Sequence, residues 1–159
     1  MLSVKSFWLL SCVPLMLSVF CFADEAKDEA IKRDQKQIQG NWRIIGLEIN
    51  GNKAKEEDAR KLLVINGDDG TWKLMSEGKE VCRGTSTIDP TTKPKQLDFI
   101  ITEGSGAGNQ YHAIYELGDK KRKMCFAPKS KDRPADFISS IGSEVILVYF
   151  EKEMPSSKP

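Results

Sequence analysis

Residues 38–50 read IQGNWRIIGLEIN, and this segment decides how the rest of the chain is interpreted. It begins near Gly40, passes through Trp42 and continues as a run of isoleucine and leucine residues. β-Branched and aromatic residues favour strands, and a tryptophan at the start of a strand is a large anchor for a hydrophobic core. We therefore predict a strand at 41–50, with Gly40 and Trp42 in structural roles.

Seven further segments of this kind follow, and each is bounded by glycine, asparagine, aspartate or proline residues. The additional strands are expected at 62–66, 71–76, 80–88, 96–102, 110–117, 123–127 and 144–152. One short helix is expected at 54–61, between the first two strands. Eight strands with short connections favour an up-and-down barrel or a closed sandwich, because closure removes the exposed sheet edges that promote aggregation.

Gly40-Asn41-Trp42 resembles the G-x-W signature of lipocalins and related calycins. The resemblance implies an all-β fold, an eight-stranded up-and-down antiparallel barrel, in which the tryptophan lies at the closed end. The expected helix at 54–61 then follows the first strand. The sequence departs from the family in one respect: lipocalins usually pack an arginine of the last strand over this tryptophan, whereas 144–152 offers only Lys152.

The chain from about residue 38 to 153 also resembles a family of exported lipocalin-like domains of uncharacterised function that is abundant in planctomycete bacteria. The resemblance implies the barrel fold and carries no activity, cofactor or binding residues. The matching segments are 38–42, 84–85, 88–90, 93–95, 97–98, 102–106, 114–117, 125–127 and 132–134, with Phe137.

Residues 1–23 are predicted to be a secretory signal peptide, which would make the protein periplasmic, cell-envelope-associated or secreted. Lys5 precedes an uncharged apolar run, and Ala23 ends it just before the acidic Asp24. An uncleaved anchor, or a lipid-modified Cys12 or Cys21, are the alternatives. The other predicted boundaries are a polar helical or flexible lead-in at 24–37, the barrel domain at 38–153 and a disordered tail at 154–159.

Removal of the predicted signal peptide also takes Lys5 away and leaves equal numbers of basic and acidic residues. This balance argues against nucleic acid as a partner. The same cleavage leaves Cys82 and Cys125, which form a disulfide in one interpretation and are two small buried hydrophobic residues in the other.

The predicted ligand-binding residues are Tyr111, Tyr115 and Arg133. Both tyrosines have an apolar body and a polar tip, as suits the wall of a cavity. Arg133 either receives an anionic ligand at an opening of the barrel, or pins the loop at 128–143 by pairing with Asp132, Asp136 or a strand carboxylate.

No catalytic residue, metal site or cofactor is predicted. His112 is the only histidine of the chain, and it falls on the strand face opposite Tyr111 and Tyr115, where a solvated side chain is expected. No metal-ligand spacing, nucleophile–base pair or paired carboxylates are recognisable in the sequence.

Two functions are compatible with these features. The first is an exported barrel that binds a small apolar or amphiphilic ligand. The second is an interaction or structural module of the cell envelope with a packed barrel and no ligand. The second rests on Ile45, Leu47 and Ile49, which strict alternation places on the outer face of the first strand, where a partner could cover them.

Overall fold

The computed structural model describes residues 19–154. It contains two helices and nine strands within that range. The elements are α1 (Val19–Ile38), β1 (Gly40–Ile49), β2 (Asn52–Lys53), α2 (Glu56–Ala59), β3 (Leu62–Asn66), β4 (Thr71–Ser76), β5 (Lys79–Asp89), β6 (Lys95–Gly104), β7 (Gln110–Leu117), β8 (Lys121–Pro128) and β9 (Ile146–Lys152).

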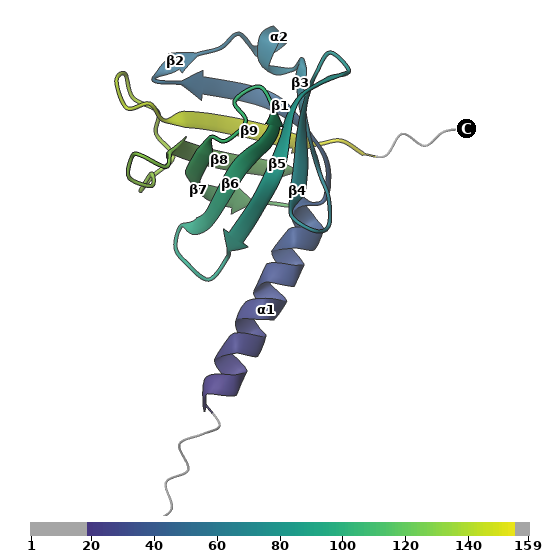
Figure 1. The fold of residues 1–159 in the computed structure, drawn as a ribbon, viewed down its shortest axis with the longest axis vertical. Helices are drawn as coiled ribbons and strands as arrows, with labels where there is room; N and C mark the ends of the chain where they lie inside the picture. Colours follow the sequence, from purple (N-terminus) through teal and green to yellow (C-terminus); the bar gives the residue numbers. More distant parts are fainter. Residues whose placement is uncertain (1–18, 155–159) are drawn as a thin grey trace, which may run out of the picture.

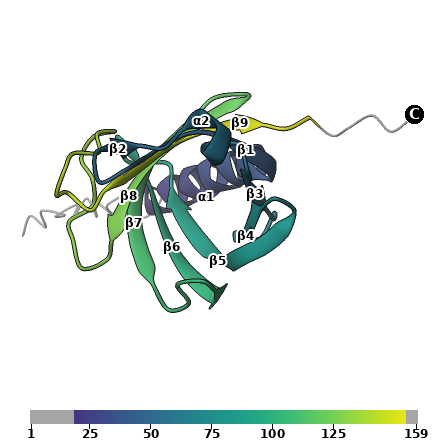
Figure 2. The ribbon, with the colours of Figure 1, turned by 90° about the horizontal axis from the view of Figure 1, so that it is seen from above.

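Eight of the strands form a closed antiparallel barrel. Each pairs with its neighbour in chain order, from β1 and β3 through to β9, and β9 then pairs with β1 (Figures 1 and 2). The short β2 only extends the end of β1 as a hairpin. The predicted up-and-down barrel is therefore confirmed, as is the short helix after its first strand.

The observed strand bounds follow the predicted ones closely. Three strands, β3, β4 and β7, have the predicted limits, and the others differ by one or two residues at an end. The helix α2 is shorter than expected, because only 56–59 is helical. Its Ala59 is buried in the cluster that contains Trp42.

The prediction for the outer face of β1 is wrong for Leu47 and Ile49. A β-bulge between Ile44 and Gly46 inserts one extra residue opposite β9. Because strand side chains alternate with a period of two, one inserted residue reverses which face the following side chains occupy. Trp42 and Ile44 face inward before the bulge, and Leu47 and Ile49 line the interior after it.

One end of the barrel is closed by α1 and Trp42. The helix projects from the barrel along most of its length (Figure 1), and its last turns pack against the barrel end through Asp34 and Ile38, which are both buried. Gly40 has a φ of 104°, a conformation that favours glycine, and it turns the chain from the helix into β1. The Trp42 indole is fully buried and donates a hydrogen bond to the Ile38 carbonyl at 2.6 Å.

A separate hydrophobic cluster lies on the outside of the barrel wall. Ile114, Cys125 and Leu147 are buried there, and Phe137 and Val145 of the 129–145 connection pack over them. This connection between β8 and β9 thus acts as a cover for part of the outer face. The predicted signal peptide at 1–23 and tail at 154–159 fall largely outside the described residues, and α1 begins at Val19.

Candidate functional site

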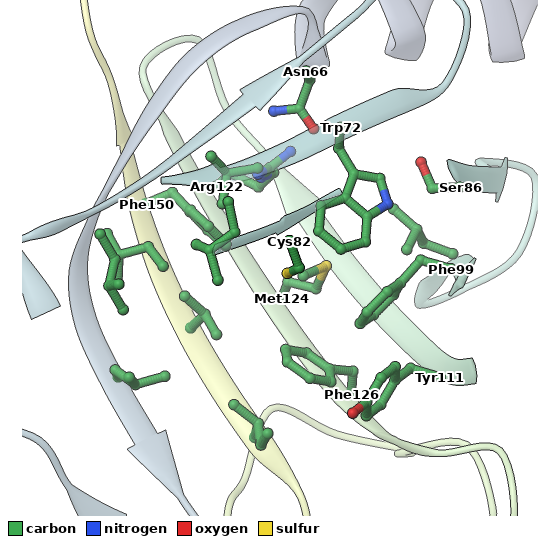
Figure 3. Close-up of a pocket in the computed structure, with 18 of the residues that line it drawn as sticks. Asn66, Trp72, Cys82, Ser86, Phe99, Tyr111, Arg122, Met124, Phe126 and Phe150 are labelled. Carbon is green, nitrogen blue, oxygen red and sulfur yellow. The ribbon is translucent and has the colours of Figure 1, made fainter. Parts of the chain in front are cut away.

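The barrel interior contains a cavity of about 290 Å³. Its walls are almost wholly aliphatic and aromatic, and they come from the inward faces of all eight barrel strands (Figure 3). This volume is close to the lower end of the range for small-molecule sites, about 300 to 1,000 Å³. The cavity is therefore large enough for one small ligand and too apolar to favour water.

The two ends of the cavity differ in chemistry. Ile49 lines it at the end away from α1 and is 48% exposed, which marks the mouth. Tyr111 and Phe126 lie toward this end, whereas Asn66, Trp72 and Arg122 lie at the end near α1 (Figure 3). The polar nitrogen atoms are thus concentrated in the deep half of the cavity.

Four aromatic rings form one continuous side of the cavity. The Phe99 ring stacks on Tyr111 with centroids 4.7 Å apart, and it meets Trp72 and Phe126 edge to face at 5.7 and 5.1 Å. Such pairs are favourable beyond the area they bury, by about 0.5–1.5 kcal/mol each. The arrangement gives the cavity a rigid aromatic wall that leads inward from Tyr111.

Within residues 19–154, Arg122 of β8 is the only charged side chain that lines this cavity. It is 6% exposed, and its guanidinium carbon lies 4.3 Å from the Phe150 ring centroid and 4.9 Å from that of Trp42. Burial lowers the pKa of Arg122 to about 9, so the group stays charged at neutral pH. Stacking on rings contributes about 2 kcal/mol when desolvated, whereas removing an ion from water costs several kcal/mol.

Arg122 of β8 occupies the place over Trp42 that an arginine of the last strand usually takes in lipocalins. On the last strand of this chain only Lys152 was found, and its Nζ is in fact 5.3 Å from the Trp42 ring centroid. The signal for Arg122 is present in the sequence, because it shares one face of β8 with the inward Met124 and Phe126. The predicted strand at 123–127 began one residue too late to include it.

Three buried donor atoms at this site lack a hydrogen-bond partner among the described residues. They are Nδ2 of Asn66, Nε1 of Trp72 and Nε of Arg122. All three side chains line the cavity. Buried donors in folded proteins are nearly always paired, so these three atoms mark the polar part of an otherwise apolar cavity.

Comparisons with known proteins identify no relative of this chain. No protein-family model, curated protein or solved structure matches the chain. Among the described residues, no cluster of three or more His, Cys, Asp or Glu side chains could hold a metal ion. Neither of the helices in that part of the chain combines the length and apolar character needed to cross a membrane.

Of the three predicted ligand-binding residues, only Tyr111 lines the cavity. The Tyr115 hydroxyl instead donates a hydrogen bond to Oδ2 of Asp34 at 2.8 Å, under α1. Burial and the neighbouring Asp34 carboxylate raise the pKa of Tyr115, so its hydroxyl is a permanent donor.

Arg133 lies outside the cavity, where the 129–145 connection crosses the barrel wall. Its Nη1 donates to the carbonyl groups of Leu97 and Ala113 at 3.0 and 2.7 Å, and its Nη2 lies 2.7 Å from Oδ1 of Asp98. His112 Nδ1 is 2.8 Å from the same Asp98 oxygen. Partial burial by itself would raise the pKa of Asp98, but the hydrogen bonds with His112 and Arg133 outweigh it and hold the pKa below its ordinary value.

The two cysteines of the barrel are free thiols that lie in different places. Cys82 of β5 lines the interior cavity, and Cys125 of β8 belongs to the outer cluster with Ile114 and Leu147. Burial raises the pKa of both thiols, that of Cys125 to about 11. Both are therefore small apolar side chains at neutral pH.

We expect these thiols to react slowly with Ellman's reagent. The reagent needs a thiolate, so at pH 8 the raised pKa of Cys125 alone should slow its reaction about a hundredfold relative to the unfolded chain. Because Cys125 ionises at a higher pH in the folded than in the unfolded chain, its contribution to the stability of the fold is fully present below the unfolded-state pKa. That contribution is lost as the pH rises toward 11.

The measurement is the absorbance time course with and without guanidinium chloride, in a chain carrying Cys12→Ser and Cys21→Ser. Two thiols should react promptly only after denaturant is added. Rapid reaction of either thiol in the native protein, or a mass lower by two hydrogens, would contradict the placement of Cys82 and Cys125.

Proposed function

We propose that this chain is an exported lipocalin-like carrier that binds a small apolar or amphiphilic molecule inside its barrel. The observation that carries the proposal is the apolar interior cavity of about 290 Å³ with an aromatic wall. Export is proposed from the sequence pattern of 1–23, and the relationship to the planctomycete family from the segments quoted above.

The cavity supports a ligand more strongly than it supports a packed barrel. A barrel with a purely structural role would fill its interior with side chains, and the interior of an eight-stranded barrel is narrow enough for side chains to fill it. Apolar cavities of this kind, by contrast, take up apolar molecules because water gains few hydrogen bonds inside them. The bulge at Ile45 also removes Leu47 and Ile49 from the outer surface on which the packed alternative relied.

A neutral fluorophore tests this proposal directly. N-Phenyl-1-naphthylamine brightens in apolar surroundings, so we expect saturable binding to the wild-type protein. Leu74 of β4 lines the cavity, whereas the adjacent Lys73 is exposed on the opposite face. Leu74→Phe, which adds volume to the interior, should weaken binding about tenfold, and Lys73→Phe should leave it unchanged.

Circular dichroism and thermal unfolding of both variants establish that they are folded before binding is compared. Absence of saturable binding by the wild-type protein would argue against a carrier function. Equal loss of binding in both variants would show that the fluorophore binds elsewhere than in the barrel.

A further inference from the structure

The fully buried polar atoms of the cavity that lack a partner among the described residues are all of one kind. Asn66 Nδ2, Trp72 Nε1 and Arg122 Nε are hydrogen-bond donors, and none has a partner among residues 19–154. A protein interior rarely leaves three donors of one site unsatisfied. Their common requirement is a hydrogen-bond acceptor, which the oxygen atoms of a ligand headgroup could supply.

The charge of the cavity also favours a ligand that carries acceptor oxygen atoms. No aspartate, glutamate or histidine lines it, so the Arg122 guanidinium gives the interior one positive charge with no counter-ion from the described residues. Burial of the guanidinium is the sole cause of its lowered pKa, because no carboxylate lies near enough to oppose the effect. An anion at this position would be attracted in a medium of low dielectric constant.

The position of these groups sets the orientation of a ligand. Arg122 and Asn66 lie at the end of the cavity near α1 (Figure 3), and the wall from there to the mouth is mainly aliphatic and aromatic. Figure 3 shows the indole nitrogen of Trp72 on the side of Ser86, apart from the other two donors. We therefore assign the primary headgroup position to Arg122 with Asn66.

We propose that the ligand is a medium-length acyl chain with a carboxylate headgroup, bound with the carboxylate against Arg122 and the chain directed toward the mouth. This inference rests on the proposed carrier function and specifies its ligand class. A single guanidinium balances the single charge of a carboxylate, whereas a phosphate monoester carries about −1.5 to −2 and would leave negative charge buried. A volume of about 290 Å³ holds about ten groups of methylene or water size, at about 30 Å³ each.

The test compares three ten-carbon probes with different headgroups: decanoate, 1-decanol and decyltrimethylammonium. Each is titrated at pH 7.5 against protein loaded with N-phenyl-1-naphthylamine. We expect decanoate to displace the fluorophore at least tenfold more tightly than decanol, and decyltrimethylammonium to bind most weakly. In Arg122→Met, decanoate should lose tenfold or more in affinity while decanol keeps or gains affinity.

Lys121→Met is the matched control, because it removes a positive charge from the adjacent, exposed position of the same strand. It should behave as the wild-type protein. Equal affinity for decanoate and decanol in the wild-type protein, or an unchanged preference in Arg122→Met, would overturn the assignment of the carboxylate. In those cases the fluorophore still binds, and the carrier function survives. Failure of the fluorophore and all three probes would instead remove the carrier function.

A second readout does not depend on the folding of any variant. Decanoate labelled with carbon-13 at its carboxyl group can be titrated with acid while bound to the wild-type protein. A carboxylate beside Arg122 should have a pKa below that of the free acid, because the guanidinium favours the charged form. A bound carboxyl group with a raised pKa would place it in apolar surroundings and overturn the proposal.

Discussion

Replacement of Trp42 by alanine is expected to lower the free energy of unfolding by about 3 to 5 kcal/mol, the usual range for removing a large buried aromatic side chain. The indole is fully buried, and it contacts the core residues at the closed end of the barrel. Its removal would also leave the Ile38 carbonyl without its donor and Arg122 without one of its two stacking rings. Urea denaturation followed by circular dichroism measures the loss.

Trp42→Phe separates the contribution of the buried ring from that of the hydrogen bond to Ile38. It keeps an aromatic ring at the closed end and loses the donor to Ile38, so an intermediate loss is expected, with about 1 kcal/mol of it from the hydrogen bond. A loss below about 1 kcal/mol in Trp42→Ala would show that the closed end does not depend on this residue.

Replacement of Asp34 by alanine is expected to lower the free energy of unfolding by about 3 kcal/mol, the lower end of the range for breaking a buried ion pair. Asp34 is 1% exposed, and its Oδ2 accepts hydrogen bonds from Lys95 Nζ at 2.6 Å and the Tyr115 hydroxyl at 2.8 Å. Without the carboxylate, the buried Tyr115 hydroxyl loses its acceptor. Lys95 is partly exposed and can regain water, which keeps the loss near the lower bound.

Lys27→Ala is the control for this prediction, since Lys27 makes an exposed ion pair between α1 and Asp89. It should cost less than about 1 kcal/mol, as surface pairs usually do. Hydrogen exchange across 24–38 provides the local readout, because α1 should lose protection in Asp34→Ala and keep it in Lys27→Ala. Equal effects of the two substitutions would contradict the role of Asp34 in holding the helix.

The strands could be predicted from the sequence because their signals are local. Alternation on 96–102 and 110–117, with glycine and asparagine between segments, fixes strands without knowledge of their partners. The resemblance of Gly40-Asn41-Trp42 to the lipocalin signature, together with eight predicted strands, implied a barrel with the tryptophan at its closed end. These features depend on residues that are neighbours in the chain.

The parts that could not be predicted depend on contacts between distant residues. Asp34 belongs to a polar stretch that resembles a solvated helix, and its partners Lys95 and Tyr115 are 61 and 81 positions away. The bulge at Ile45 is visible only in the register with β9.

The candidate site shows the same division. Tyr111 was predicted from its amphipathic character, but Arg122 was missed because charged residues are expected outside a barrel. Arg133 was weighed both as a ligand-binding and as a loop-pinning residue, and its partners turned out to be Asp98 and two strand carbonyl groups. The charged residue that faces the cavity, Arg122, is thus one that composition alone would assign to the surface.

Native mass spectrometry of the natural protein shows whether the barrel interior holds the proposed small molecule. The protein is purified without detergent from the organism that produces it and measured under native and denaturing conditions. We expect a native mass that exceeds the polypeptide mass by one small molecule, which is released on denaturation and carries a carboxylate. A native mass equal to that of the polypeptide alone would rule out a bound ligand.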